Sequence, residues 1–434
     1  MVSDPRFFPR PGRANDAHSS LSLAERDRRW GLVRAEMARR GIDCLVVIGS
    51  GVNGVGNCRW LDNADAAERS LMFPAKGEPM ILYGLPGFGK WYARCAWEGV
   101  GFRGIYGQIS SGAAEYVIDH GYAKGTVGIV GLSGGWSLEG SISYFTFENL
   151  KRLLPDATFV NATDMLYEVR TVKSAEEIAL IEKAAELSNI EFDNYLKNAR
   201  PGVRELQLYA DAYHAAMCAG NDIGGDYTTL LCSGKDEGYH CMRRPTDRML
   251  KRGDLVMIAH YTRFGGYWSH PHTAISLGPL DEEYRPMRDA VYEATQRALE
   301  LIKPGAAWDD IMPEMDKPVL ERGYYFEICH IHGVGLDGNE PPRTAMRAGK
   351  VPNQAPYRTP PLKSSIFDNP EYRKHTGDRR NSTEGMTVKE GMALAIEVTA
   401  CKDDRLYMEF GPQVVVDKAG TRVLTPDACD VIEI

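Results

Sequence analysis

The chain has 434 residues, of which 43% are hydrophobic and 25% charged, which is enough for two domains with full cores. A formal net charge of −8 without a block of lysine and arginine argues against binding to nucleic acid or to an anionic membrane. The nine cysteines are scattered and lack the close spacing of a cysteine zinc site, which favours a reducing compartment. We expect a cytoplasmic protein, because residues 1–20 lack the apolar run of a secretory signal and no stretch is long enough to span a bilayer.

The first part of the chain alternates helices and strands. Ser22, with Glu25 three residues later, forms a capping-box pattern, and apolar residues then recur at helical spacing as far as Gly41. Short apolar runs predict strands at 42–48, 71–74, 80–83 and 127–130. Strands interleaved with helices predict an α/β domain, which we place at residues 1–170.

The character of the chain changes near residue 170, and we assign residues 171–434 to a second domain. Ser174 and Glu177 form another capping box, which opens a long amphipathic helix to about residue 197. Strand-rich stretches follow, and two further helices are expected at 283–302 and 308–322. The polar, proline-rich segment 344–385 is read either as a lid or interface loop or as a solvated insertion.

Six segments of the second domain occur in the order of a known family. They read RTVKSAEEIALIEKAAELSN, GDLVMI, FGGYWSHPHTAISLG, HIHGVGLDGNEPPR, EGMALAIEV and VVVDKAGTRVLTP. With these segments the chain resembles the creatinase/prolidase superfamily, which includes aminopeptidase P. The resemblance implies an α+β fold, in which a pita-bread catalytic domain follows a smaller, creatinase-type α/β domain. It also implies a homodimer in which the amino-terminal domain reaches the active site of the partner.

In peptidases of this superfamily two Asp, one His and two Glu hold two metal ions that activate a water for amide hydrolysis. The positions that match these five ligands are occupied here by Ala259, His270, His332, Glu397 and Gly411. An alanine has no donor atom, and the glycine could be replaced by Glu409, two residues earlier, only through a bulge in the strand. The resemblance therefore implies that the two-metal site has been lost.

The leading hypothesis is a metal-independent hydrolase without a cofactor that cleaves a C–N bond in a small polar, non-peptide compound, as creatinase and ectoine hydrolase do. His240 stands where creatinase has its acid/base histidine, and imidazole both takes and gives protons near neutral pH. Glu397 and His332 complete the catalytic set. The predicted substrate-binding residues are His270, His272, Glu409, Arg69 and Arg343.

Three alternatives stay open. One is a lyase that cleaves a C–S, C–C or C–O bond by proton abstraction at one divalent transition-metal ion (Fe, Mn or Zn). Its ligands would be His270, His332, Glu397 and Glu409, with His272 as a substitute for Glu409. The others are an Xaa-Pro-type aminopeptidase and a peptide-binding module without catalysis. The retained imidazoles and carboxylates argue against such a module.

Overall fold

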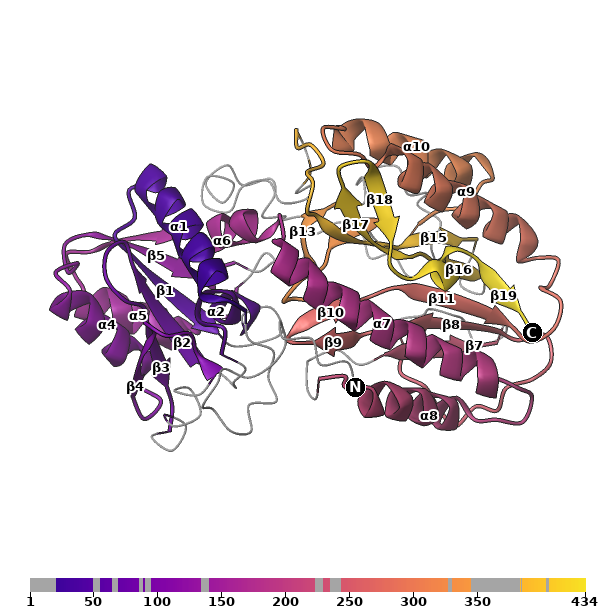
Figure 1. The fold of residues 1–434 in the computed structure, drawn as a ribbon, viewed down its shortest axis with the longest axis horizontal. Coiled ribbons are helices and arrows are strands. Elements are labelled where there is room, and N and C mark those ends of the chain that lie inside the picture. Colours follow the sequence, from indigo (N-terminus) through magenta and orange to yellow (C-terminus); the bar gives the residue numbers. More distant parts are fainter. Residues whose placement is uncertain are drawn as a thin grey trace. The chain divides into compact units, whose positions relative to one another are not determined.

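The computed structural model describes residues 21–49, 55–64, 69–85, 89, 95–133, 140–222, 229–234, 243–326, 330–344, 383, 385–402 and 406–434. The chain forms two compact units, which divide between Arg170 and Thr171 (Figure 1). Within the described ranges, no helix combines the length and the apolarity needed to cross a membrane.

The first unit is built on a six-stranded sheet with the order β4-β3-β2-β1-β5-β6. Its strands are β1 (Cys44–Gly49), β2 (Arg69–Pro74), β3 (Met80–Tyr83), β4 (Gly101–Gly104), β5 (Thr126–Val130) and β6 (Thr158–Asn161). Its helices are α1 (Leu23–Arg40), α2 (Val55–Asp62), α4 (Ile109–Asp119), α5 (Tyr144–Leu153) and α6 (Thr163–Arg170). β1 pairs antiparallel with β2 and parallel with β5, so strands lie at all four predicted positions. Gly41 ends α1 in the left-handed region, with φ of 65°, which glycine adopts without strain.

The second unit combines two helix pairs with several short sheets. Its helices are α7 (Ala175–Asn198), α8 (Glu205–Cys218), α9 (Arg285–Leu301) and α10 (Trp308–Glu321). Its strands are β7 (Leu230–Ser233), β8 (Leu255–Ala259), β9 (Thr262–Phe264), β10 (Tyr267–Ser269), β11 (His272–Ser276), β12 (Ile331–Gly333), β13 (Glu340–Arg343), β14 (Ala393–Ile396), β15 (Val398–Cys401), β16 (Tyr407–Phe410), β17 (Gln413–Asp417), β18 (Gly420–Val423) and β19 (Val431–Glu433). The larger sheets have the orders β19-β11-β8-β7 and β13-β12-β14-β17-β18.

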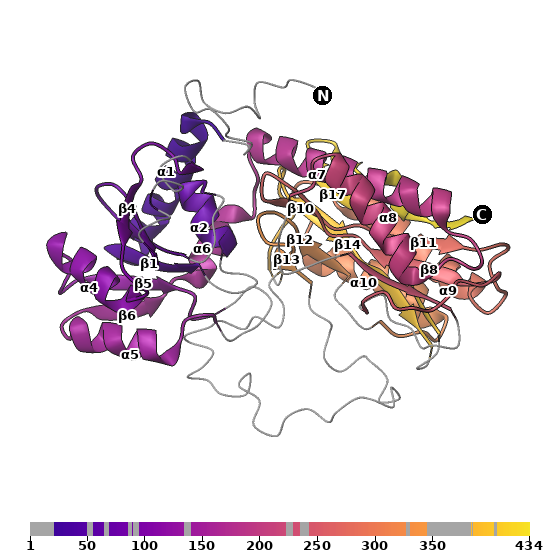
Figure 2. The ribbon, with the colours of Figure 1, turned by 90° about the horizontal axis from the view of Figure 1, so that it is seen from below.

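The sheet that contains β8 is buried on both faces. Leu255, Met257 and Ala259 of β8 belong to the core that includes α9 and α10. The alternating residues Val256 and Ile258 belong to the core that includes α7 and α8. A strand that is covered on both faces reads as a continuous apolar run, which explains the sequence LVMIA. Figure 2 shows α7 and α8 side by side along this unit.

The long helix α7 begins where the capping box predicts. The side chain of Ser174 accepts the backbone N–H of Glu177 at 3.2 Å, and the carboxylate of Glu177 accepts the N–H of Ser174 at 3.0 Å. Two of the otherwise unpaired N–H groups at the start of the helix are thereby bonded. The first helix of the second unit is thus fixed a few residues after the division between the units.

Candidate metal centre

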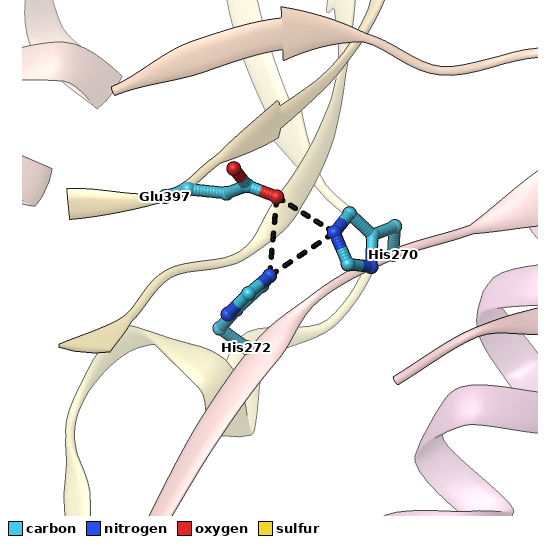
Figure 3. A group of neighbouring side chains, drawn as sticks. All are labelled: His270, His272 and Glu397. Atoms are coloured by element: carbon cyan, nitrogen blue, oxygen red, sulfur yellow. Dashed lines mark hydrogen bonds and ion pairs between the residues drawn. The ribbon is translucent and has the colours of Figure 1, made fainter. Parts of the chain in front are cut away.

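Four buried side chains of the second unit meet around one carboxylate oxygen. Oε1 of Glu397 lies 2.7 Å from Nε2 of His270, 3.1 Å from Nε2 of His272 and 2.8 Å from Nε2 of His332. The Nε2 atoms of His270 and His272 are themselves 3.1 Å apart. Figure 3 shows His270, His272 and Glu397 pointing toward one another. At most 4% of the surface of any of the four residues is exposed.

The backbone brings these side chains together from separate strands. His270 precedes β11, His272 is its first residue, His332 lies in β12, and Glu397 links β14 to β15. His270 and His272 are two residues apart on an extended segment, so both rings lie on the same side of it.

In two of these histidines, the hydrogen bond made by Nδ1 fixes the tautomer of the ring. Nδ1 of His270 lies 2.7 Å from the backbone carbonyl of His260, and Nδ1 of His332 lies 2.8 Å from that of Gly333. A carbonyl oxygen only accepts, so in both rings Nδ1 carries the proton. When they are neutral, the rings of His270 and His332 would therefore direct the Nε2 lone pair toward Glu397.

The donor set fits a bound cation. In their neutral form His270 and His332 would present lone pairs to the same small volume as the carboxylate oxygen of Glu397. Buried acceptors that face one another are costly without a proton or an ion between them. Ligands that lie about 2.1 Å from a common transition-metal ion are separated by roughly 3.0 to 3.4 Å. The observed separations of 2.7 to 3.1 Å approach that range. His270, His272 and Glu397 together form a group that could hold a metal ion.

The electrostatics of the cluster also favour a bound cation. Burial opposes ionisation of Glu397, but the three imidazoles outweigh it and hold the pKa of this carboxyl well below its usual range. Burial lowers the pKa of His270, more than the carboxylate of Glu397 raises it. Burial would also lower the pKa of His272, but the carboxylates of Glu409 and Glu397 raise it to about 10. In the metal-free protein His272 thus carries the proton that balances this pocket.

Two positions that the resemblance matches to metal ligands, 259 and 411, offer no donor atom in this chain. Ala259 offers no donor atom and lies opposite His272 in the pairing of β8 with β11. A Cβ added to Gly411 would lie 1.9 Å from the carbonyl oxygen of Ile396, so a side chain at this position would force the backbone to shift. Gly411 and His272 exchange backbone hydrogen bonds of 2.9 and 3.0 Å, which places the ring of His272 beside the glycine.

A group of buried polar side chains supports His270 through the backbone of His260, and the sequence did not predict it. Nδ1 of His260 lies 2.7 Å from Oε2 of Glu191 in α7, and its Nε2 lies 2.9 Å from the hydroxyl of Thr273. These contacts fix His260, whose carbonyl accepts from His270. The available signal was a histidine inside an apolar strand segment, since a buried imidazole needs a polar partner.

The other predicted site residues lie elsewhere or outside the described residues. Glu409 contacts Nδ1 of His272 at 3.0 Å, on the opposite ring nitrogen from the cluster. The guanidinium of Arg69, in the first unit, is fully buried against the carboxylate of Asp62 at 2.7 Å, and that pair would have to open for Arg69 to bind a substrate. Arg343 is half-buried in β13, where it pairs in register with His332. His240 lies outside the described residues, as does most of segment 344–385.

Comparisons with known proteins connect this geometry to a family. An Xaa-Pro dipeptidase of Pyrococcus furiosus is 30% identical over 223 residues, which cover 49% of this chain and 63% of the dipeptidase. The chain thus matches less than two thirds of that relative's length. An ectoine hydrolase of Halomonas elongata is 25% identical over 320 residues, covering 67% of this chain and 76% of the hydrolase. The solved structure of an Xaa-Pro dipeptidase from Bacillus anthracis superimposes with a TM-score of 0.73 at 18% identity, covering 94% of this chain and all of the dipeptidase, and confirms the predicted pita-bread fold.

The prediction of a protein without a cofactor is wrong. The family model of Metallopeptidase family M24 matches residues 179–418, which is more than half of the chain and contains the whole cluster. A family of metallopeptidases and a buried group of two imidazoles and a carboxylate that could hold an ion together overturn it. The matching family consists of peptidases, which are hydrolases. By its sequence over this range, the chain belongs to metallopeptidase family M24.

Proposed function

We propose that the protein is a hydrolase that cleaves a C–N bond in a small polar compound and uses one divalent transition-metal ion. The ligands would be His270, His272, His332 and Glu397. The observation that carries this proposal is the convergence of imidazole Nε2 atoms on Oε1 of Glu397. A donor set of three imidazoles and one carboxylate suits zinc or iron and does not suit magnesium or calcium, which prefer oxygen ligands.

Two features support a small substrate and a single ion. Ala259 and Gly411 remove the ligands of the second ion that the superfamily's peptidases use. The similarity to an ectoine hydrolase spans 76% of that protein, a larger share than the similarity to the dipeptidase of Pyrococcus furiosus.

We also propose the homodimer that the resemblance implies.

The protein's own groups have distinct roles in this proposal. When bound, a divalent ion would supply a Lewis acid that polarises the substrate and lowers the pKa of a water. Hydrogen bonds at Nδ1 of His270 and His332 hold these rings with Nε2 toward the site. Glu397 supplies negative charge that offsets the cation in a buried volume. His240 stays the predicted proton-transfer group.

The proposal is tested by measuring metal content and products together. Protein purified without chelator or added metal is expected to contain one zinc or iron ion per chain. Metal well below one ion per chain, with full thermal stability retained after chelation, would contradict the proposal. The metal-loaded protein is then screened against small cyclic amidines, ureas and amides, with Xaa-Pro dipeptides in parallel.

The products of a positive substrate distinguish the candidate reactions. Products whose summed composition equals the substrate plus one water support hydrolysis. Products that sum to the substrate alone indicate a lyase and refute the hydrolase. Turnover confined to Xaa-Pro dipeptides would identify a dipeptidase and contradict the small non-peptide substrate.

Metal binding is expected to depend on pH through His272. The carboxylates of Glu409 and Glu397 raise the pKa of His272 to about 10, so the metal-free ring is protonated at neutral pH. An ion that binds at Nε2 displaces this proton, and affinity therefore rises about tenfold for each pH unit between pH 7 and pH 9. Calorimetry in buffers of different ionisation enthalpy would count the proton released. The same binding without proton release would contradict this role of His272, and His272→Gln should abolish the release.

A further inference from the structure

Behind His272, away from Glu397, lies a pair of buried side chains from β16. Oε1 of Glu409 is 3.0 Å from Nδ1 of His272, and the hydroxyl of Tyr407 donates to Oε2 of Glu409 at 2.6 Å. Glu409 and Tyr407 are 1% and 4% exposed. Each carboxylate oxygen of Glu409 therefore has a polar group of the protein beside it.

The strand geometry explains why these residues meet. Tyr407 and Glu409 are two residues apart in β16, so their side chains lie on one face of the strand. β16 pairs with β15, where Thr399 is opposite Glu409. Just beyond β16, Gly411 exchanges two backbone hydrogen bonds with His272. This pairing holds the first residue of β11 next to the end of β16, and so sets the imidazole of His272 against the carboxylate.

The contact with Glu409 sets His272 apart from the other two histidines. His270 and His332 donate from Nδ1 to backbone carbonyls, which are neutral. Only His272 has a carboxylate at this nitrogen. At 3.0 Å the two groups form an ion pair. A carboxylate beside the second ring nitrogen of a metal-ligating histidine orients the ring and makes Nε2 a stronger donor to the metal. Because Gly411 offers no ligand, this support acts on the histidine whose backbone pairs with it.

We propose that Glu409 is a positioning residue that acts through His272 to make it a metal ligand, and that Tyr407 holds the carboxylate of Glu409 in place. The proposal rests on the metal-dependent function proposed above. It assigns Glu409 to the support of a ligand rather than to direct contact with the ion or the substrate.

Metal affinity tests this role without an assay of turnover. Zinc affinity is measured by competition with a chromophoric chelator for the wild type, Glu409→Gln and Tyr407→Phe. Glu409→Gln is expected to weaken zinc binding by about 10- to 100-fold, and Tyr407→Phe by a smaller factor. The absorption spectrum of the cobalt(II)-loaded protein should shift in Glu409→Gln, because the orientation of one imidazole ligand changes.

A neighbouring core residue provides the control for a merely structural effect. The side chain of Met408, between Tyr407 and Glu409, is fully buried in the hydrophobic core. Met408→Ala should lower the melting temperature and leave zinc affinity and the cobalt spectrum unchanged. If Met408→Ala weakened zinc binding as much as Glu409→Gln, the effect of Glu409 would be one of stability alone and the proposal would fail.

A double-mutant cycle separates this proposal from the proposed function. If Glu409 acts through His272, then His272→Ala and the double variant with Glu409→Gln bind zinc with the same affinity. Losses that add in the double variant would show that Glu409 acts on its own and would overturn the proposal. If the wild type binds zinc tightly and Glu409→Gln binds it equally well, the positioning role fails while the metal function stands. A wild type that binds no metal refutes both.

Discussion

Glu397→Gln is expected to lower metal affinity by more than about a hundredfold, a larger loss than that caused by removing a residue that only supports a ligand. Oε1 of this carboxylate lies within 3.1 Å of Nε2 in all three histidines, and its pKa is held well below the usual range. The amide has the same shape but no charge to offset a divalent ion. Hydrolysis should fall with the metal content, as measured by elemental analysis and turnover on the same preparation.

Another buried carboxylate serves as the matched control for that substitution. Glu205 in α8 is fully buried and pairs with Arg243 at 2.7 Å and with the hydroxyl of Ser233 at 2.6 Å. Glu205→Gln should reduce stability, because it weakens a buried ion pair, and should leave the metal content unchanged. Full metal retention in Glu397→Gln would remove Glu397 from the ligand set.

Gly411→Ala is expected to destabilise the protein by about 3 kcal/mol or more, a large effect for the addition of one methyl group. The new Cβ would lie 1.9 Å from the carbonyl oxygen of Ile396, and backbone cannot move as a flexible side chain does. The strand would have to shift, and its two hydrogen bonds to His272 would weaken. Both the midpoint of urea unfolding and the zinc affinity should therefore fall.

The same substitution at an open position is expected to act in the opposite direction. Gly31 lies inside α1, and a Cβ added there meets no atom within 4 Å. Gly31→Ala should stabilise the protein by roughly 0.5 to 1 kcal/mol, because alanine favours the helix over the unfolded chain. If Gly411→Ala unfolded at the wild-type midpoint, position 411 would have room for a side chain. The steric argument against a glutamate at this position would then be refuted.

Much of the fold could be predicted because its signals are local. The capping box of Ser174 and Glu177 marks the start of α7, and short apolar runs mark the strands of the first unit. Such patterns depend on residues that are close in sequence. The family segments supplied the rest, because their motifs identify His332 and Glu397 as site residues. The two residues do lie together in the structure.

The loss of ligands predicted the absence of a cofactor, and this inference failed for a geometric reason. Counting donors along the chain showed that Ala259 and Gly411 offer none. It did not show that His272 lies beside Gly411, because that contact joins strands that are far apart in sequence. The separation of roles between His272 and Glu409 depends on which ring nitrogen faces which carboxylate. Such an orientation is a property of the folded backbone and is not encoded in residue spacing.

The proposed metal ligands are distant from one another along the chain. Glu397 lies 65 residues from His332 and 125 from His272. An ion held by all of them would act as a cross-link that closes long loops and reduces the conformational entropy of the unfolded chain. A link that closes a loop of about 100 residues stabilises a protein by roughly 4 to 5 kcal/mol in the chain-entropy description. Protein synthesised under metal limitation would then be degraded faster, so its abundance would report the metal supply of the cell.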